Sequence, residues 1–152
     1  MLKNRKNGNY ITDRRRFRSQ LKKILDFRPG NISMYEVAFI HRSASFNLPD
    51  GKRINNERLE YLGDAVLDAM LSDYLFEKFP DASEGFLTKI RARIVNRDVL
   101  NNLAVSMGLN NLLISNLGAS NSTRNLYGDA LEALIGALFL DKGFKKTKKL
   151  FI

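Results

Sequence analysis

The fold of this chain depends most on the stretch Asn55-Asn56-Glu57-Arg58-Leu59-Glu60-Tyr61-Leu62-Gly63-Asp64-Ala65. At about 100° per residue, Glu57, Glu60 and Asp64 fall within an arc of roughly 60° on a helix. The other faces are apolar, so the pattern predicts an interior helix with one acidic stripe. Carboxylates on such a helix repel one another and are costly to desolvate. A positively charged partner must therefore lie against them.

A second apolar segment, from Tyr127 to Leu138, repeats the arrangement with Asp129 and Glu132 three residues apart. Each predicted helix also contains an interior glycine, Gly63 or Gly136, which costs about 1 kcal/mol relative to alanine. Glycine is expected at these positions if the two helix backbones approach closely. Packed side by side, the helices would place up to five carboxylates around one cavity. A divalent cation is the natural occupant of that cavity.

The residue types present also limit which cation would bind. The sequence has no Cys, and its only His, His41, lies outside both acidic segments. Zinc sites favour Cys and His, and di-iron carboxylate bundles use Glu-x-x-His pairs. An all-oxygen ligand set instead favours Mg²⁺, with Mn²⁺ as a substitute. Two such ions about 3.5–4 Å apart commonly support phosphodiester chemistry.

Residues Asn56 to Asp64 resemble the signature stretch of the ribonuclease III family. The segment Asp129 to Gly136 is similar to that family's second acidic motif, and His41-Arg42-Ser43 and Arg91 to Val95 match the family in order. The resemblance covers roughly residues 33–144. It implies an endonuclease domain of bacterial type that forms a homodimer and hydrolyses double-stranded RNA with Mg²⁺. The implied products carry 5′-phosphate and 3′-hydroxyl ends, in rRNA or other structured-RNA processing.

The resemblance further implies roles for the acidic side chains. Glu60, Asp129 and Glu132 would hold the metal ions, and Asp64 would ligate directly or through water. Among these, Asp64 and Glu132 are the predicted catalytic residues. Glu57 matches an acid close to the cleft, where it would either ligate, support the site or contact substrate.

For several other side chains, the sequence predicts either a role in the dimer or in RNA binding, or an ordinary structural or surface role. Tyr61, where the family commonly has Phe, is predicted at the dimer interface; the alternative is a core aromatic. Glu84 and Arg91 either contact RNA or lie on ordinary surface, and Asp68 is expected at the surface. His41 is expected to be a hydrogen-bonded structural residue, because metal-dependent hydrolysis needs no side-chain base. Candidate phosphate contacts are Lys89, Arg93 and Arg97.

The pattern along the chain shows no strand alternation and no internal repeat, which predicts an all-α fold. We expect a disordered basic lead over residues 1–9 and one endonuclease domain over 10–152, with a mobile linker over 115–125. Ser33-Met34-Tyr35-Glu36 has the pattern of a capping box that opens a helix. We expect a first helix from residue 12 or 13. Further helices are expected over about 33–41, 56–79, 84–95, 97–107 and 126–141, and from 144 onward.

The charge of the chain is unevenly distributed, with a net charge of +9 overall. Residues 1–28 contain ten Lys or Arg against two Asp, and residues 142–152 contain five Lys and no acid, whereas the intervening body has a net charge of −4. Basic ends on an acidic body favour a polyanionic partner, although they could also act only to keep the protein soluble. No apolar run reaches 18 residues, so no membrane span is expected. The absence of Cys fits a cytoplasmic protein.

Two other functions fit parts of this pattern. A catalytically silent relative could bind structured RNA or ribosomes, but such a protein is expected to lose one or more of the acids. A carboxylate bundle for oxygen chemistry is disfavoured by the missing His residues. Members of the family usually carry a separate double-stranded-RNA-binding domain after the nuclease, and this chain has none. We expect truncation to explain this, rather than a form that works without that module.

Overall fold

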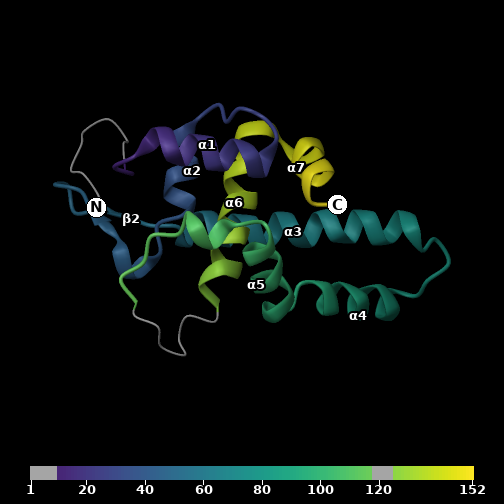
Figure 1. Cartoon of the computed structure of the whole chain (residues 1–152). Helices are drawn as coiled ribbons and strands as arrows, with labels where there is room; N and C mark the ends of the chain where they lie inside the picture. Colours follow the sequence, from purple (N-terminus) through teal and green to yellow (C-terminus); the bar gives the residue numbers. More distant parts are fainter. Residues whose placement is uncertain (1–9, 118–124) are drawn as a thin grey trace.

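The computed structural model describes residues 10–117 and 125–152, and this part of the chain is mostly helical (Figure 1). The predicted helical fold class is confirmed. A small antiparallel hairpin, in which Phe46 pairs with Ile54, was not expected. The expectations for residues 1–9, and for most of 115–125, lie outside the described residues.

The elements are α1 (Arg14–Leu25), α2 (Ile32–Ala38), η1 (Arg42–Ala44), β1 (Phe46–Asn47), β2 (Arg53–Ile54), α3 (Glu57–Lys78), α4 (Glu84–Ile94), α5 (Arg97–Ser106), η2 (Leu109–Asn111), α6 (Leu126–Lys142) and α7 (Phe144–Phe151).

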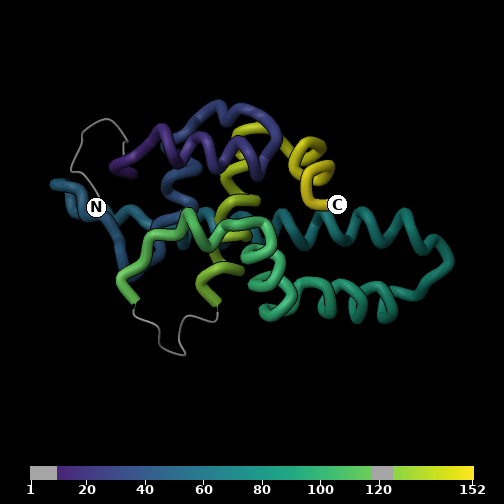
Figure 2. The backbone as a smooth tube through the Cα atoms, viewed as in Figure 1, coloured from purple at the N-terminus to yellow at the C-terminus, as the bar shows by residue number. Residues whose placement is uncertain are grey.

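Helix α6 passes through the middle of the molecule and crosses the long helix α3 (Figure 2). Nearly every position from Ala130 to Leu138 is buried, because the segment is apolar on all faces. Helices α2, α5 and α7 also pack against α6. The α6 helix therefore holds its few acidic side chains in a fixed position within the core.

The crossing of α3 and α6 depends on two glycines that face each other's backbone. A methyl group at Gly63 would collide with the carbonyl oxygen of Glu132, and one at Gly136 would collide with that of Leu59. The predicted close approach of the two helices is confirmed. Because the contact lies one turn or less from Glu60 and beside Glu132, it also sets the spacing between these acids.

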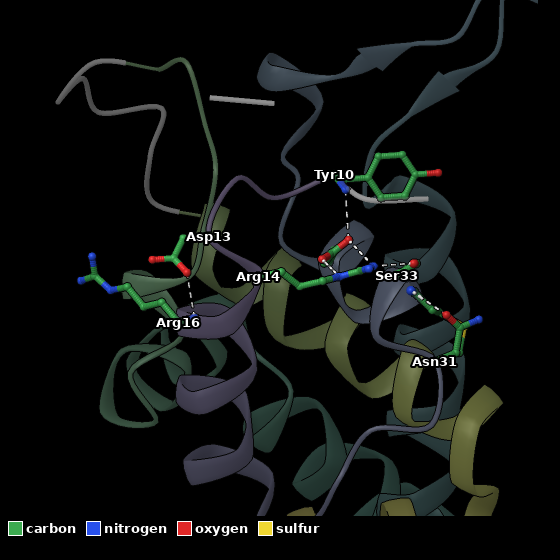
Figure 3. Close-up of polar contacts among 8 residues, drawn as sticks. Tyr10, Asp13, Arg14, Arg16, Asn31 and Ser33 are labelled. Carbon is green, nitrogen blue, oxygen red and sulfur yellow. Dashed lines mark hydrogen bonds and ion pairs between the residues drawn. The ribbon is translucent and has the colours of Figure 1, made fainter. Parts of the chain in front are cut away.

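The start of α2 differs from the predicted capping box. Asn31 is the N-cap, and its side chain accepts a hydrogen bond from the Met34 amide (Figure 3). Glu36 does not reach back to the start of the helix, because it is buried and paired with Arg14 of α1 at 2.6 Å. Ser33 accepts a hydrogen bond from the same guanidinium. A long-range ion pair has therefore replaced the local pattern.

The remaining helix boundaries agree with the sequence patterns to within a few residues. Ser83 caps α4 by accepting a hydrogen bond from the Phe86 amide, and Gly108 follows α5 with a φ of 81°. Gly143 ends α6 with a φ of 79°. Within the described residues, no helix has both the length and the apolar composition that crossing a bilayer requires.

Candidate metal centre

Three carboxylates meet where α3 crosses α6. Glu60 comes from the first turns of α3, and Asp129 and Glu132 come from the N-terminal half of α6. One oxygen from each side chain lies within 4.8 Å of the other two, and all three residues are half-buried. Oxygen ligands at this separation suit a hard divalent cation.

The other two predicted acids of α3 line the same pocket but are more exposed. Asp64 and Glu57 both border a pocket of about 850 Å³ together with the three clustered acids. Asp64 is not part of the tight group, which leaves it room to act through water. Asn55 holds Glu57, since its amide nitrogen donates to Glu57 Oε2 at 3.1 Å. The structure thus brings all five acids to one pocket.

The beginning of α3 is held in place by Asn56, which is almost fully buried. Its backbone N–H donates to the Ile40 carbonyl at 2.8 Å, and its side-chain amide donates to the Ala38 carbonyl at 3.3 Å. Its own carbonyl oxygen accepts from the Glu60 amide at 2.8 Å. The position of Glu60 is therefore tied to the core segment that precedes the hairpin.

The surroundings of the three clustered acids disfavour the negatively charged form of each carboxyl group. Burial and the nearby carboxylates raise the pKa of Glu60 to about 6 and that of Glu132 to about 7. Burial also raises the pKa of Asp129, and the positive charges of Arg97 and Arg42 partly oppose this. Among the described residues, none forms an ion pair with these three carboxylates. Within the described part of the chain, no Lys or Arg side chain therefore neutralises the cluster by direct pairing, which leaves it suited to a cation.

These raised pKa values predict how stability depends on pH. Between the unfolded value of about 4.5 and the folded values near 6 and 7, the folded protein binds more protons than the unfolded chain. The contribution of Glu60 and Glu132 to stability is therefore present at low pH and lost as the pH rises through this window. We expect calorimetry of the metal-free protein to give a higher Tm at pH 5 than at pH 8, after correction for a double variant with Gln at both positions. Added Mg²⁺ should raise Tm at pH 8 and have little effect at pH 5, because protons and metal compete. A wild-type profile that matches the double variant would contradict this.

His41 takes the structural role predicted for it. Its Nδ1 accepts a hydrogen bond from the Ser43 amide at 3.1 Å and lies 2.8 Å from Ser43 Oγ. Burial and the neighbouring Arg42 charge lower the pKa of His41, which favours the neutral acceptor form. Ser43 in turn accepts from the Asn116 amide at 3.0 Å. The network fixes one wall of the acidic pocket.

Cationic side chains border the pocket, and the sequence predicted only one of them. Arg97 lines it as a candidate phosphate contact, whereas the roles of Arg42 and Arg53 were missed. The one available signal was the place of Arg42 inside the His41-Arg42-Ser43 motif. The other two candidates, Lys89 and Arg93, are exposed on α4 and do not line the pocket.

The two predicted site residues of α4 do not reach the acidic pocket of their own chain. Glu84 accepts a hydrogen bond from Thr88 at 2.9 Å. Arg91 donates to Ser72 at 2.7 Å and lies 3.8 Å from Asp68, so Asp68 has the surface role expected of it. Substrate contacts by Glu84 and Arg91 stay predictions.

Tyr61 lies on the surface, so the alternative of a core aromatic was wrong. Its side chain is 82% exposed. It borders both the acidic pocket and a neighbouring, mostly apolar groove of about 1030 Å³. Leu59, Leu62 and the 55% exposed Leu140 also line this groove. Tyr61 therefore lies where apolar surface is exposed beside the acidic pocket.

Comparison with known proteins identifies related chains. The family model described as ribonuclease-III-like matches residues 31–152. A protein named ribonuclease 3 from Bacteroides thetaiotaomicron is 45% identical over 127 residues, which are 84% of this chain and 41% of that protein. Ribonuclease 3 from Zunongwangia profunda is 41% identical over 140 residues, which are 92% of this chain and 55% of the relative. The chain spans roughly half the length, or less, of these two relatives.

Solved structures show the same fold. The nuclease domain of ribonuclease III from Campylobacter jejuni has a TM-score of 0.75 and 35% sequence identity, covering 86% of this chain and 90% of that one. The structure of that protein is described as showing flexibility in a region involved in dimer formation.

Proposed function

Because this chain belongs to the ribonuclease III family, we propose that it is the nuclease part of an endoribonuclease that cleaves double-stranded RNA with a divalent metal. The observation that carries the proposal is the cluster of Glu60, Asp129 and Glu132 in a pocket open to solvent. The three clustered residues offer only carboxylate oxygens, which supports Mg²⁺ as the physiological ion and Mn²⁺ as a substitute. A cytoplasmic location stays a prediction.

Each acid has a distinct part in the proposed chemistry. Glu60, Asp129 and Glu132 would hold the metal, and exposed Asp64 would orient water at the pocket edge. A divalent cation bound there supplies charge neutralisation at the phosphodiester and an activated nucleophile near neutral pH. Half-burial of the carboxylates keeps bulk water away from part of the site, which strengthens their hold on a cation.

The rim of the pocket favours a nucleic acid over a small acidic metabolite. Arg42, Arg53 and Arg97 surround the acids, and Arg42 and Arg97 form no ion pair with the described residues. Their guanidinium groups would contact phosphates on either side of the reacting one. We propose that the A-form shape of duplex RNA is recognised more than its bases, and that the products carry 5′-phosphate and 3′-hydroxyl ends.

The direct test is cleavage of a perfect RNA duplex by the purified chain, with the products sized by electrophoresis. We expect cleavage with Mg²⁺ or Mn²⁺ and none with EDTA. A DNA duplex of the same sequence should stay intact, because it lacks the 2′-hydroxyls and the A-form groove. Duplex binding without cleavage in Mg²⁺ would instead favour the catalytically silent alternative.

We further propose that two copies of the chain associate through the groove beside Tyr61. Tyr61→Ala should then raise the dimer dissociation constant by about tenfold or more, because buried aromatic anchors dominate such interfaces. Leu103→Ala is the matched control, since Leu103 is 40% exposed on α5 and does not line the groove. Sedimentation velocity measures both variants. Equal association of the Tyr61→Ala variant and the wild type would contradict the assignment.

A further inference from the structure

The outward face of α1 carries five cations, one neutral exposed side chain (Ser19) and no acid. Arg15, Arg18 and Lys22 form one exposed stripe, flanked by Arg16 and Lys23. At 100° per residue these five side chains span an arc of about 160°, opposite the buried side of the helix. None of them forms an ion pair with the described residues. We call these five residues the α1 basic face.

The N-terminal part of this face works against the stability of its own helix, whereas Lys22 and Lys23 lie in the last turn, where the helix dipole favours positive charge. The first turn of α1 contains no acid but does contain Arg15 and Arg16, where the helix dipole disfavours positive charge. Arg18 follows Arg15 by three residues and precedes Lys22 by four, so like charges are adjacent along the stripe. Such a departure from local preference indicates a functional role.

Among the cations of α1, Arg14 is the one that forms an ion pair within the described fold. Arg14 pairs with buried Glu36, which also accepts a hydrogen bond from the Tyr10 amide at 3.1 Å. Phe17 and Leu21 are buried on the same side of the helix. Figure 3 shows Arg14 directed toward this cluster and Arg16 extending away from it. The helix is thus firmly anchored on one side and presents its cations on the other.

The α1 basic face is separate from the acidic pocket, to which no residue of α1 contributes. The loop and helix that follow α1 attach to the opposite end of α6, where Asp141 accepts hydrogen bonds from Gly30 and Tyr35. Asp141 lies twelve residues beyond Asp129, or about 18 Å along the helix axis. A ligand on this face would not occupy the catalytic pocket.

We propose that the α1 basic face is a second RNA-binding surface that holds the phosphates of a duplex or structured RNA away from the cleavage site. The choice of RNA as the polyanion rests on the proposed function. An anionic membrane fits less well, because amphipathic membrane helices insert an apolar face, and the apolar side of α1 is already buried in the core. The contacts would be sequence-independent and sensitive to salt.

The test compares two triple variants of the full chain for binding to a long perfect RNA duplex. In one, Arg15, Arg18 and Lys22 are each changed to Gln, which keeps the helix propensity. In the other, three exposed lysines of α7 are changed to Gln, which removes the same charge. Affinity is measured in EDTA over a range of KCl concentrations, so the result does not depend on cleavage. The control positions are Lys145, Lys146 and Lys149.

We expect the α1 triple variant to bind about tenfold or more weakly and to reduce the slope of log Kobs against log [KCl] by about 3, as for the loss of three phosphate contacts. Its Tm should equal or exceed that of the wild type. If the triple variant fails to fold, Arg18→Gln alone should reduce the slope by about 1.

Unchanged binding, or an equal loss in the α7 triple variant, would overturn the proposal. So would loss of binding to anionic vesicles with duplex binding retained. If the wild type binds duplex through this face but does not cleave it with Mg²⁺, the proposed function fails and the binding surface stands.

Discussion

Glu132→Gln is expected to abolish cleavage of duplex RNA with Mg²⁺ and at the same time to stabilise the metal-free protein. Removing one ligand of the cluster should lower kcat at least about a thousandfold, since a bound cation supplies several kcal/mol of transition-state stabilisation. The same carboxylate is half-buried near Asp64, Glu60 and Asp129, and its pKa is raised to about 7. At pH 8 the neutral amide relieves this repulsion, so Tm should rise by about 2–6 °C.

The control for this prediction is Glu77→Gln. Glu77 lies near the far end of α3, is exposed, and lies 3.6 Å from Lys148. Its replacement should leave kcat unchanged and alter stability by no more than about 0.5 kcal/mol. Activity is measured with saturating duplex in Mg²⁺, and Tm by calorimetry in EDTA. A Glu132→Gln variant that still cleaves RNA, or that melts earlier than the wild type, would count against the metal centre.

The two acidic helices could be predicted because their signals are local. An apolar segment with helical period is an interior helix wherever it lies, and glycine within it, as at Gly63 and Gly136, indicates close backbone contact. The same reasoning placed Glu60, Asp129 and Glu132 on facing sides of one crossing. Side-chain type and spacing alone predicted a shared cavity with up to five acids, whereas the choice of these three as metal ligands came from the family resemblance.

Features that depend on distant partners could not be predicted in this way. The Ser33 to Glu36 pattern satisfies the local rule for a capping box, but Glu36 is more strongly bound by Arg14, 22 residues earlier. The bridge between Ile40 and Ile114, and the bonds from Asn116 to Ser43, close the pocket wall across more than 70 residues. No periodicity in either segment indicates its partner.

A second large effect is expected at the helix crossing, where Gly63→Ala should destabilise the protein by about 3–5 kcal/mol. The added methyl group would meet the backbone carbonyl of Glu132, which cannot rotate away as a side chain could. The helices must separate to relieve the overlap, and Glu60 then moves away from its partners on α6. We therefore expect Tm to fall by about 10 °C or more, together with a loss of Mg²⁺-dependent cleavage below the new Tm.

Gly85→Ala separates this steric effect from the ordinary preference of helices for alanine. Gly85 lies in the first turn of α4, and a Cβ there would have no atom within 4 Å. Alanine should stabilise this helix by about 0.5–1 kcal/mol through reduced freedom of the unfolded chain. Chemical denaturation of both variants measures the difference. If Gly63→Ala were as harmless as Gly85→Ala, α3 and α6 would not be in backbone contact, and Glu60 would have no reason to share a cation with Asp129 and Glu132.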